Sequence, residues 1–185
     1  MADRATVGDL RPIMELPLHP KLVHLPMALA ILMPLLTSGV LLAIWRDWFP
    51  KRVWSLVIVG QFLLVGSGIL ALRSGEADEE RVEKVVAEVV LERHEEAGER
   101  FVWVGGFLLA ITVLPLLLRS KRATLITGAA SCAGTFVVLA FGYQVGQLGG
   151  EIVYGHNGAS VYATATPGGA LTMPAGKRAL GDDDR

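Results

Sequence analysis

"HPKLVHLPMALAILMPLLTSGVLLAIW" (residues 19–45) is the stretch that decides the fold of this chain. From Leu25 to Trp45 it contains no charged residue. A helix of about 20 apolar residues matches the hydrocarbon thickness of a bilayer. His19 and His24 stand where this block begins. The stretch therefore predicts a membrane-spanning helix with two imidazoles at one end.

Three further apolar blocks follow, at residues 53–72, 101–118 and 123–143. Hydrophobic residues make up 52% of the 185 residues, and they gather in blocks, which is typical of a membrane protein. Gln61 is the most polar residue of the second block and the best candidate for a hydrogen bond between helices. We expect an all-α integral membrane domain over residues 19–162, with four transmembrane helices in an up-down bundle. An N-terminal tail (1–18) and a disordered C-terminal tail (163–185) would flank it.

The charges of the short connections predict the orientation of the bundle. Two short loops carry three cations each: Arg46, Lys51, Arg52, and Arg119, Lys121, Arg122. Positive charge in short loops marks the cytoplasmic side of a membrane. Both termini and the long connection between the second and third blocks are then expected outside.

That long connection, residues 73–100, is acidic, with ten Asp or Glu against five Arg or Lys. Its valines recur at helical spacing, which predicts an amphipathic helix at about 78–97, capped by Ser74 or Asp78. One face of this helix continues into the third block through Val86, Val90, His94, Ala97 and Phe101. The third span is therefore expected to have a long outer extension.

The segment after the fourth block reads "GYQVGQLGGEIVYGHNGASVY" (residues 142–162). Gly149 and Gly150 are expected to end the helix. Asn157-Gly158 is a strong turn sequence between two short β-prone stretches. It predicts a short outer hairpin.

All four histidines of the chain fall on the expected outer side. Imidazole is the commonest ligand for transition metals and serves haem iron as well. His19 and His24 are five residues apart, about 140° off a common helix face, so they are not expected to chelate one ion. His24 and His94 lie on faces that are otherwise apolar and are the expected axial ligands of haem iron. His19 and His156 would form a second site or support the first, and Arg73 could pair with a haem propionate.

Several motifs resemble one bacterial membrane family, catalogued as domain of unknown function 2231. They are "HPKLVHLPMALAILMPLL" at the beginning, "GILALRSGEAD", "ERHEEAG", and "GYQVGQLGGEIVYGHNGASV" near the end. The resemblance implies four-helix integral proteins of the bacterial cytoplasmic (inner) membrane. Some members are fused to Rieske or c-type cytochrome domains, which implies a redox setting and haem b. A separate redox protein or a quinone would then be the electron partner.

Three functions remain open at this stage. The leading hypothesis is a haem b electron carrier of the membrane. The second is a non-haem site for a transition metal, or a metal transporter, that uses the histidines with Glu95 or Glu151. The third is a non-catalytic membrane subunit or scaffold. Catalytic motifs are absent from the sequence, and the net charge of −1 gives no reason to expect a nucleic-acid partner. We therefore expect no enzyme activity from the chain on its own, and homo-oligomers stay open.

Overall fold

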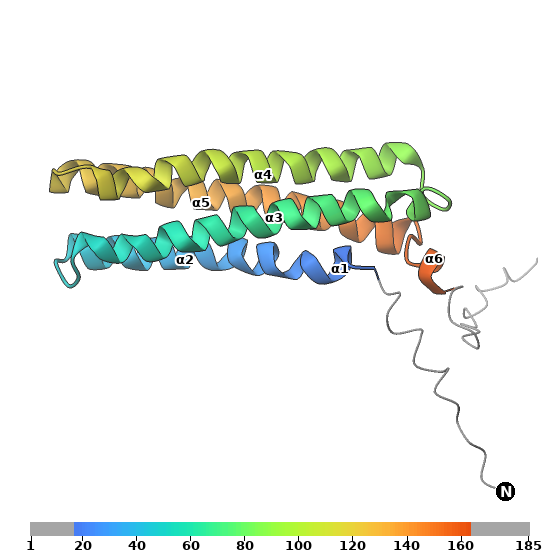
Figure 1. The fold of residues 1–185 in the computed structure, drawn as a ribbon, viewed down its shortest axis with the longest axis horizontal. Helices are drawn as coiled ribbons and strands as arrows, with labels where there is room; N and C mark the ends of the chain where they lie inside the picture. Colours follow the sequence, from blue (N-terminus) through green and yellow to red (C-terminus); the bar gives the residue numbers. More distant parts are fainter. Residues whose placement is uncertain (1–16, 164–185) are drawn as a thin grey trace, which may run out of the picture.

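The computed structural model describes residues 17–163, and these form helices without any strand (Figure 1). The elements are α1 (His19–Leu22), α2 (His24–Trp45), η2 (Lys51–Trp54), α3 (Ser55–Val82), α4 (Glu88–Leu117), α5 (Lys121–Gly150), η3 (Glu151–Gly155) and α6 (Ser160–Ala163). The expected N-terminal and C-terminal tails lie almost entirely outside the described residues.

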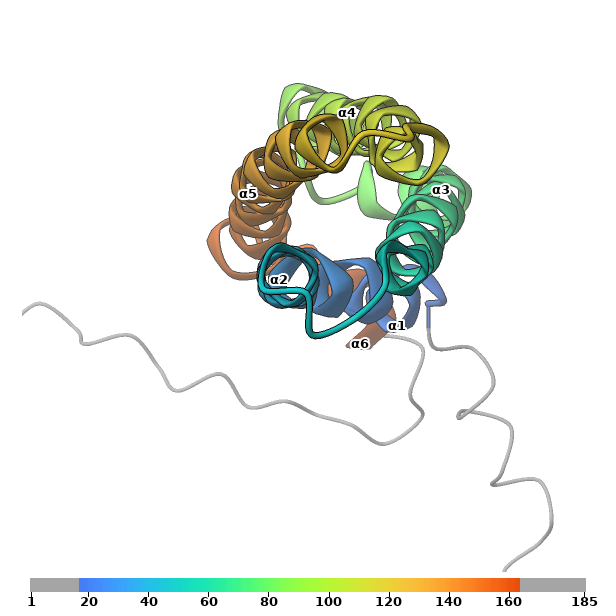
Figure 2. The ribbon, with the colours of Figure 1, turned by 90° about the vertical axis from the view of Figure 1, so that its left-hand side faces the viewer.

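The four long helices run up and down and close into a ring, in which each contacts the next along the chain and α5 contacts α2 (Figure 2). Each is long and apolar enough to cross a membrane. The four predicted spans coincide with these helices, except that the second begins within η2 and the third extends one residue beyond α4. The predicted all-α transmembrane bundle is therefore confirmed.

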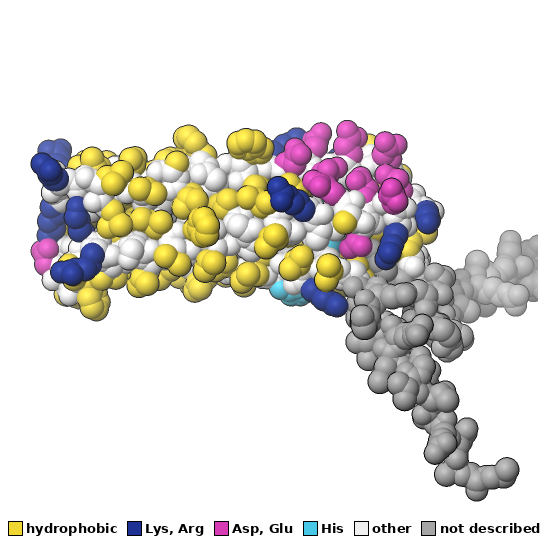
Figure 3. All heavy atoms as spheres, viewed as in Figure 1, with side chains coloured by type: hydrophobic (Ala, Val, Ile, Leu, Met, Phe, Trp, Pro, Cys, Tyr) yellow, Lys and Arg dark blue, Asp and Glu magenta, His cyan; other side chains and the backbone are white. Residues whose placement is uncertain are grey.

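The outer surface of the bundle is apolar along most of its length (Figure 3). Large hydrophobic side chains point away from the core there, including Leu35, Phe107 and Trp103, which are 69%, 70% and 78% exposed. In water a patch of this extent would be unfavourable, whereas lipid tails solvate it. This apolar band separates two charged ends of the molecule.

The core between the helices is packed by large side chains and tied by hydrogen bonds. Trp54 is fully buried and donates from Nε1 to the carbonyl oxygen of Thr112 at 2.8 Å. Gln61, also 0% exposed, donates from Nε2 to the carbonyl oxygen of Gly105 at 3.2 Å. The predicted bond of Gln61 between helices is therefore confirmed, and it joins α3 to α4.

One end of the bundle, which we call the basic end, contains the two short connections around residues 46–54 and 118–121. Lys51 donates from Nζ to the carbonyl oxygens of Leu116 and Leu118, at 3.1 and 2.8 Å, and so satisfies carbonyls at the end of α4. Lys121 pairs with Asp47 at 2.6 Å across the two connections. These contacts hold the loop after α2 against the turn between α4 and α5.

The opposite end, which we call the histidine end, differs from the prediction in the connection between α3 and α4. The expected helix at 78–97 is two pieces, because α3 continues to Val82 and α4 begins only at Glu88. Val86, which lies between the two helices, is only 2% exposed. Burial of this side chain stabilises the turn of the chain between α3 and α4. From Glu88 onward α4 runs unbroken to Leu117, which confirms the predicted extension of the third span.

The predicted hairpin after the fourth span is wrong. Gly149 and Gly150 remain helical, and α5 passes into the π-helical turn η3. The Asn157-Gly158 turn does form, with Asn157 at φ 56°. Its flanks stay helical because the amides of His156 and Gly158 bond back to the carbonyls of Glu151 and Ile152, instead of pairing across a ladder. Local turn chemistry was right, and the strand assignment was not.

Candidate functional site

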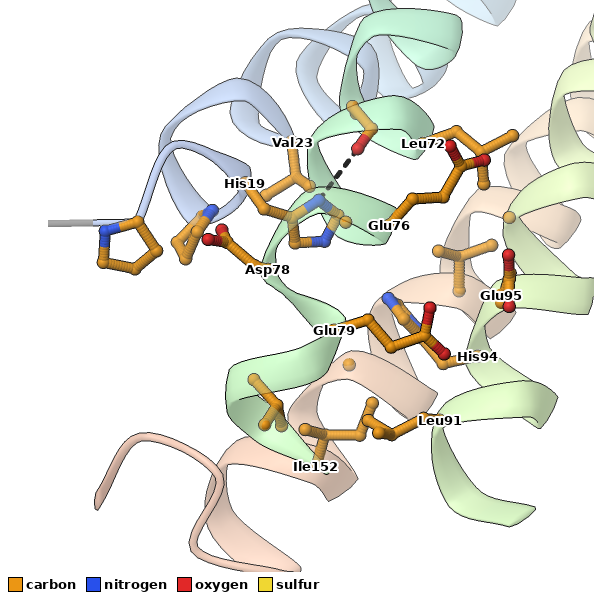
Figure 4. A pocket seen from close by; sticks show the side chains of 18 of the residues that line it. His19, Val23, Leu72, Glu76, Asp78, Glu79, Leu91, His94, Glu95 and Ile152 are labelled. Atoms are coloured by element: carbon orange, nitrogen blue, oxygen red, sulfur yellow. Dashed lines mark hydrogen bonds between the residues drawn. The ribbon is translucent and has the colours of Figure 1, made fainter. Parts of the chain in front are cut away.

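A cavity of about 490 Å³ lies inside the histidine end of the bundle. It extends inward to Gly68, Phe101 and Gly142, and its walls come from α1 to α5 and the segment beyond. The lining is largely apolar, with two histidines, His19 and His94, and four carboxylates, Glu76, Asp78, Glu79 and Glu95 (Figure 4). Among the described residues that line it there is no lysine or arginine. Ligand pockets of this size and character commonly hold one small molecule or cofactor.

His19 is the first residue of α1, a single turn that precedes α2. Pro20 follows it, where the missing amide hydrogen is not needed. Pro26 has no amide hydrogen to offer the Leu22 carbonyl, and the chain breaks between α1 and α2 at Val23. α1 contacts α3, and His19 lies at the cavity wall.

The ring of His19 is held by α3. Its Nδ1 lies 2.8 Å from the carbonyl oxygen of Ala71 and 3.2 Å from Oγ of Ser74 (Figure 4). The Ser74 hydroxyl itself donates to the Ala71 carbonyl at 2.7 Å. Because the Ala71 carbonyl can only accept, Nδ1 carries the proton and Nε2 keeps its lone pair. Histidines that ligate metals commonly have this arrangement.

His94 faces His19 from α4 (Figure 4). The two ring centroids are 6.1 Å apart, and the ring planes are nearly perpendicular at 88°. The Nδ1 atom of His94 is buried without a hydrogen-bond partner among the described residues. The Val145 backbone lies near enough to interact with this ring by hydrogen bonding. Nδ1 nevertheless has no partner with full hydrogen-bond geometry among the described residues. His94 thus offers an unused nitrogen inside the cavity wall.

Glu95, which the non-haem metal hypothesis named, lines the cavity, whereas the other predicted site residues lie elsewhere. His24 is exposed on α2, and Arg73 is exposed on α3; neither lines the cavity. His156 lies 3.7 Å from a carboxylate oxygen of Glu151, also away from the cavity. The structure therefore brings His94 together with His19 rather than with His24. Pro26 is buried against the bundle. Because His24 stands two positions earlier on the same helix, it points about 200° away from Pro26 and therefore away from the bundle.

Several residues of the site were not predicted from the sequence. Ala71, Ser74 and Gly75 contact His19 from positions i, i+3 and i+4 of α3, which is one helix face. Their spacing in "ALRSG" is a pattern that could have been noticed. The Oδ2 atom of Asp78 is buried at the cavity without a hydrogen-bond partner among residues 17–163. Its carboxylate was predicted only as a helix cap.

The geometry limits what the two imidazoles can hold. Two nitrogens that each lie about 2.0–2.1 Å from one shared ion place their ring centroids about 6 Å apart, close to the separation of His19 and His94. Within the described part of the chain, no group of three or more His, Cys, Asp or Glu side chains is arranged to hold a metal ion. The pair therefore suits a group that brings most of its own ligands.

Comparison with known proteins identifies a family but no characterised relative. The family model described as "Predicted membrane protein (DUF2231)" matches residues 15–161, which include α1 to α5 and all four histidines. Searches of curated proteins and of solved structures returned no match to this chain. Because the match covers most of the chain, this protein belongs to the DUF2231 family of predicted membrane proteins.

Proposed function

We propose that this membrane protein binds haem b between His19 and His94 and transfers electrons at the histidine end of the bundle. The observation that carries the proposal is the pair of imidazoles, which face each other with centroids 6.1 Å apart and planes at 88°. Two imidazoles that held one iron ion between them would have ring centroids about this far apart. His24, which the sequence favoured as a ligand, is replaced by His19.

The small number of protein ligands favours haem over a bare ion. A porphyrin supplies four nitrogens to its iron, so two imidazoles complete the coordination. A bare zinc or copper ion would need further side chains, and no cluster of three or more is arranged for one in residues 17–163. The apolar lining and the volume of about 490 Å³ also suit a flat hydrophobic group.

Each part of the chain has a defined task in this proposal. When bound, haem iron supplies one-electron redox chemistry. The Ala71 carbonyl orients His19 and keeps its Nε2 free to ligate. The apolar walls exclude water. The carboxylates Glu76 and Glu79 give the cavity a negative field, which favours the more positive, oxidised iron. The described residues of the lining include no cation that could pair with a haem propionate.

The proposal also places the protein in a cell. The apolar band and the cationic short connections support the bacterial cytoplasmic membrane, with the basic end inside and the histidine end outside. The chain would act as a carrier or subunit rather than as an enzyme on its own. Its electron partner would be a separate redox protein or a quinone, and a homo-oligomer is compatible with this reading.

One observation favours a second candidate, a non-haem transition-metal site. Asp78 lines the same cavity, and its buried Oδ2 has no partner among the described residues. If this carboxylate turned toward the imidazoles, it would supply a third ligand. The acidic lining also attracts a bare cation more than a haem with two propionates. This alternative predicts a bound metal without a porphyrin spectrum.

The test is to express the full chain with ample haem supply, purify it in detergent and record oxidised and reduced absorbance spectra together with metal analysis. We expect a Soret band, sharp bands on reduction and one iron per chain. Zinc or copper without a Soret band would favour the second candidate. Neither haem nor metal after attempts to load both would overturn the proposal and leave a membrane subunit or scaffold.

A further inference from the structure

Each of the two cavity histidines lies against a glycine of a neighbouring helix. A Cβ atom built on Gly75 of α3 would lie 3.2 Å from both Cε1 and Nδ1 of His19. A Cβ atom built on Gly149 of α5 would lie 3.2 Å from Cε1 of His94. Both distances are tighter than most contacts that a real Cβ makes. An alanine at either position would therefore require the neighbouring imidazole to move by a few tenths of an ångström.

This close approach is not shared by all helical glycines of the bundle. Gly150, next to Gly149, and Gly66, on the same helix as Gly75, would have no atom within 4 Å of an added Cβ. An alanine at Gly66 or Gly150 would therefore meet no neighbouring atom. An alanine at Gly75 or Gly149 would press against a histidine ring. Alanine is also the better helix former, so conformational preference does not explain glycine at 75 and 149.

We propose that Gly75 and Gly149 are positioning residues that set the separation of the His19 and His94 rings and thereby determine which group fits between them. The inference rests on the proposed function, because it concerns the same site. The two glycines act in parallel, one for each ring, from helices that lie on opposite sides of the cavity (Figure 2, Figure 4). Neither glycine needs to touch the bound group.

The rings have little freedom to avoid an added methyl group. His19 is bonded to the Ala71 carbonyl at 2.8 Å, so moving away from Gly75 strains that bond. His94 has the cavity on one side and Gly149 on the other, so a methyl group at 149 displaces its ring by a few tenths of an ångström. Ligand constellations need to be held within about 0.5 Å of their productive geometry. A shift of a few tenths of an ångström takes up much of this tolerance, and we therefore expect it to weaken binding.

The experiment uses the full chain with Gly75→Ala and Gly149→Ala, and with Gly66→Ala and Gly150→Ala as matched controls. Haem affinity is measured by titration of the ligand-free protein in detergent. We expect the two test variants to bind haem about 10–100-fold more weakly, as for other changes around ligating histidines. The controls should stay within about twofold. Equal affinities of all five proteins would overturn the inference.

A second readout separates this inference from the proposed function. Side-chain ¹⁵N–¹H correlation spectra of the imidazoles are recorded on ligand-free protein. Gly75→Ala should shift the His19 resonances, and Gly149→Ala those of His94, while the controls shift neither. If the wild type binds no haem but these shifts occur, the proposed function fails and the positioning role stands. Unshifted resonances in both test variants would overturn the positioning role, whatever the protein binds.

Discussion

The Nδ1 atom of His19 donates a hydrogen bond to the carbonyl oxygen of Ala71, 2.8 Å away and 52 residues later in the chain. A carbonyl inside a helix normally accepts only from the amide four residues on, and here a hydroxyl and an imidazole share it as well. This bond joins the single turn α1 to α3 and fixes the proton of His19 on the nitrogen that faces away from any ligand.

The first prediction concerns which histidines bind the cofactor. His19→Ala and His94→Ala should each abolish the Soret band of purified protein, because the iron would lose one of its two imidazole ligands. His24→Ala and His156→Ala should retain the band at wild-type intensity, since neither side chain lines the cavity. Loss of haem in His24→Ala together with retention in His19→Ala would restore the pairing that the sequence favoured.

The second prediction concerns Gln61 in the core. Its Nε2 donates to Gly105, but its buried Oε1 has no partner among the described residues. Hydrogen bonds inside membranes contribute about 0.6 kcal/mol on average, so Gln61→Leu should change the free energy of unfolding by less than about 1 kcal/mol. Leu64→Ala, at a fully buried position of the same helix, should cost about 2–5 kcal/mol. Unfolding in detergent measures both, and a large loss for Gln61→Leu would mean that Oε1 has a buried partner.

The third prediction concerns close packing near the basic end. A Cβ at Gly128 would lie 2.8 Å from Leu41 Cδ1 and 3.4 Å from the Trp54 ring, which is held by its bond to Thr112. Gly128→Ala should therefore destabilise the bundle by about 1–3 kcal/mol through overpacking. Gly39→Ala is the matched control, because nothing lies within 4 Å of it. Equal thermal stability of the two variants would contradict the packing described for α2, α5 and Trp54.

The fourth prediction concerns orientation. In a Cys132→Ala background, Ala87→Cys at the histidine end should react with a membrane-impermeant thiol reagent in intact spheroplasts. Ser120→Cys at the basic end should react only after the membrane is opened. Both positions are exposed, so access to solvent does not separate them. The reverse labelling pattern would place the cavity on the cytoplasmic side.

The transmembrane architecture could be predicted because it depends on length and hydrophobicity, which are local properties of the chain. The rotation of α2 about its own axis could not be predicted from the sequence. Its span is apolar all round, so periodicity does not tell which side faces the bundle, and the preference for His24 over His19 had no support from it. In the structure His19 lines the cavity, whereas His24 is exposed on the side of α2 away from the buried Pro26.

Contacts between segments that are far apart in the sequence could not be predicted from local sequence patterns either. Gly149 was read as a helix end, because glycine alone favours a break, whereas in the bundle it gives room to His94. Val86 was assigned to a helix by its spacing, although its burial against the segment near Gly158 turns the chain there. In both cases tertiary packing overrides the local preference.

The cavity is completed by both ends of the described chain, since His19 belongs to the first turn and Gly149 to the last turn of α5. During biogenesis, a ligand would therefore find no finished site until all four helices had been inserted and assembled. A cofactor would load last and from the histidine end. Once bound, it would favour the assembled bundle over partly inserted chains by mass action.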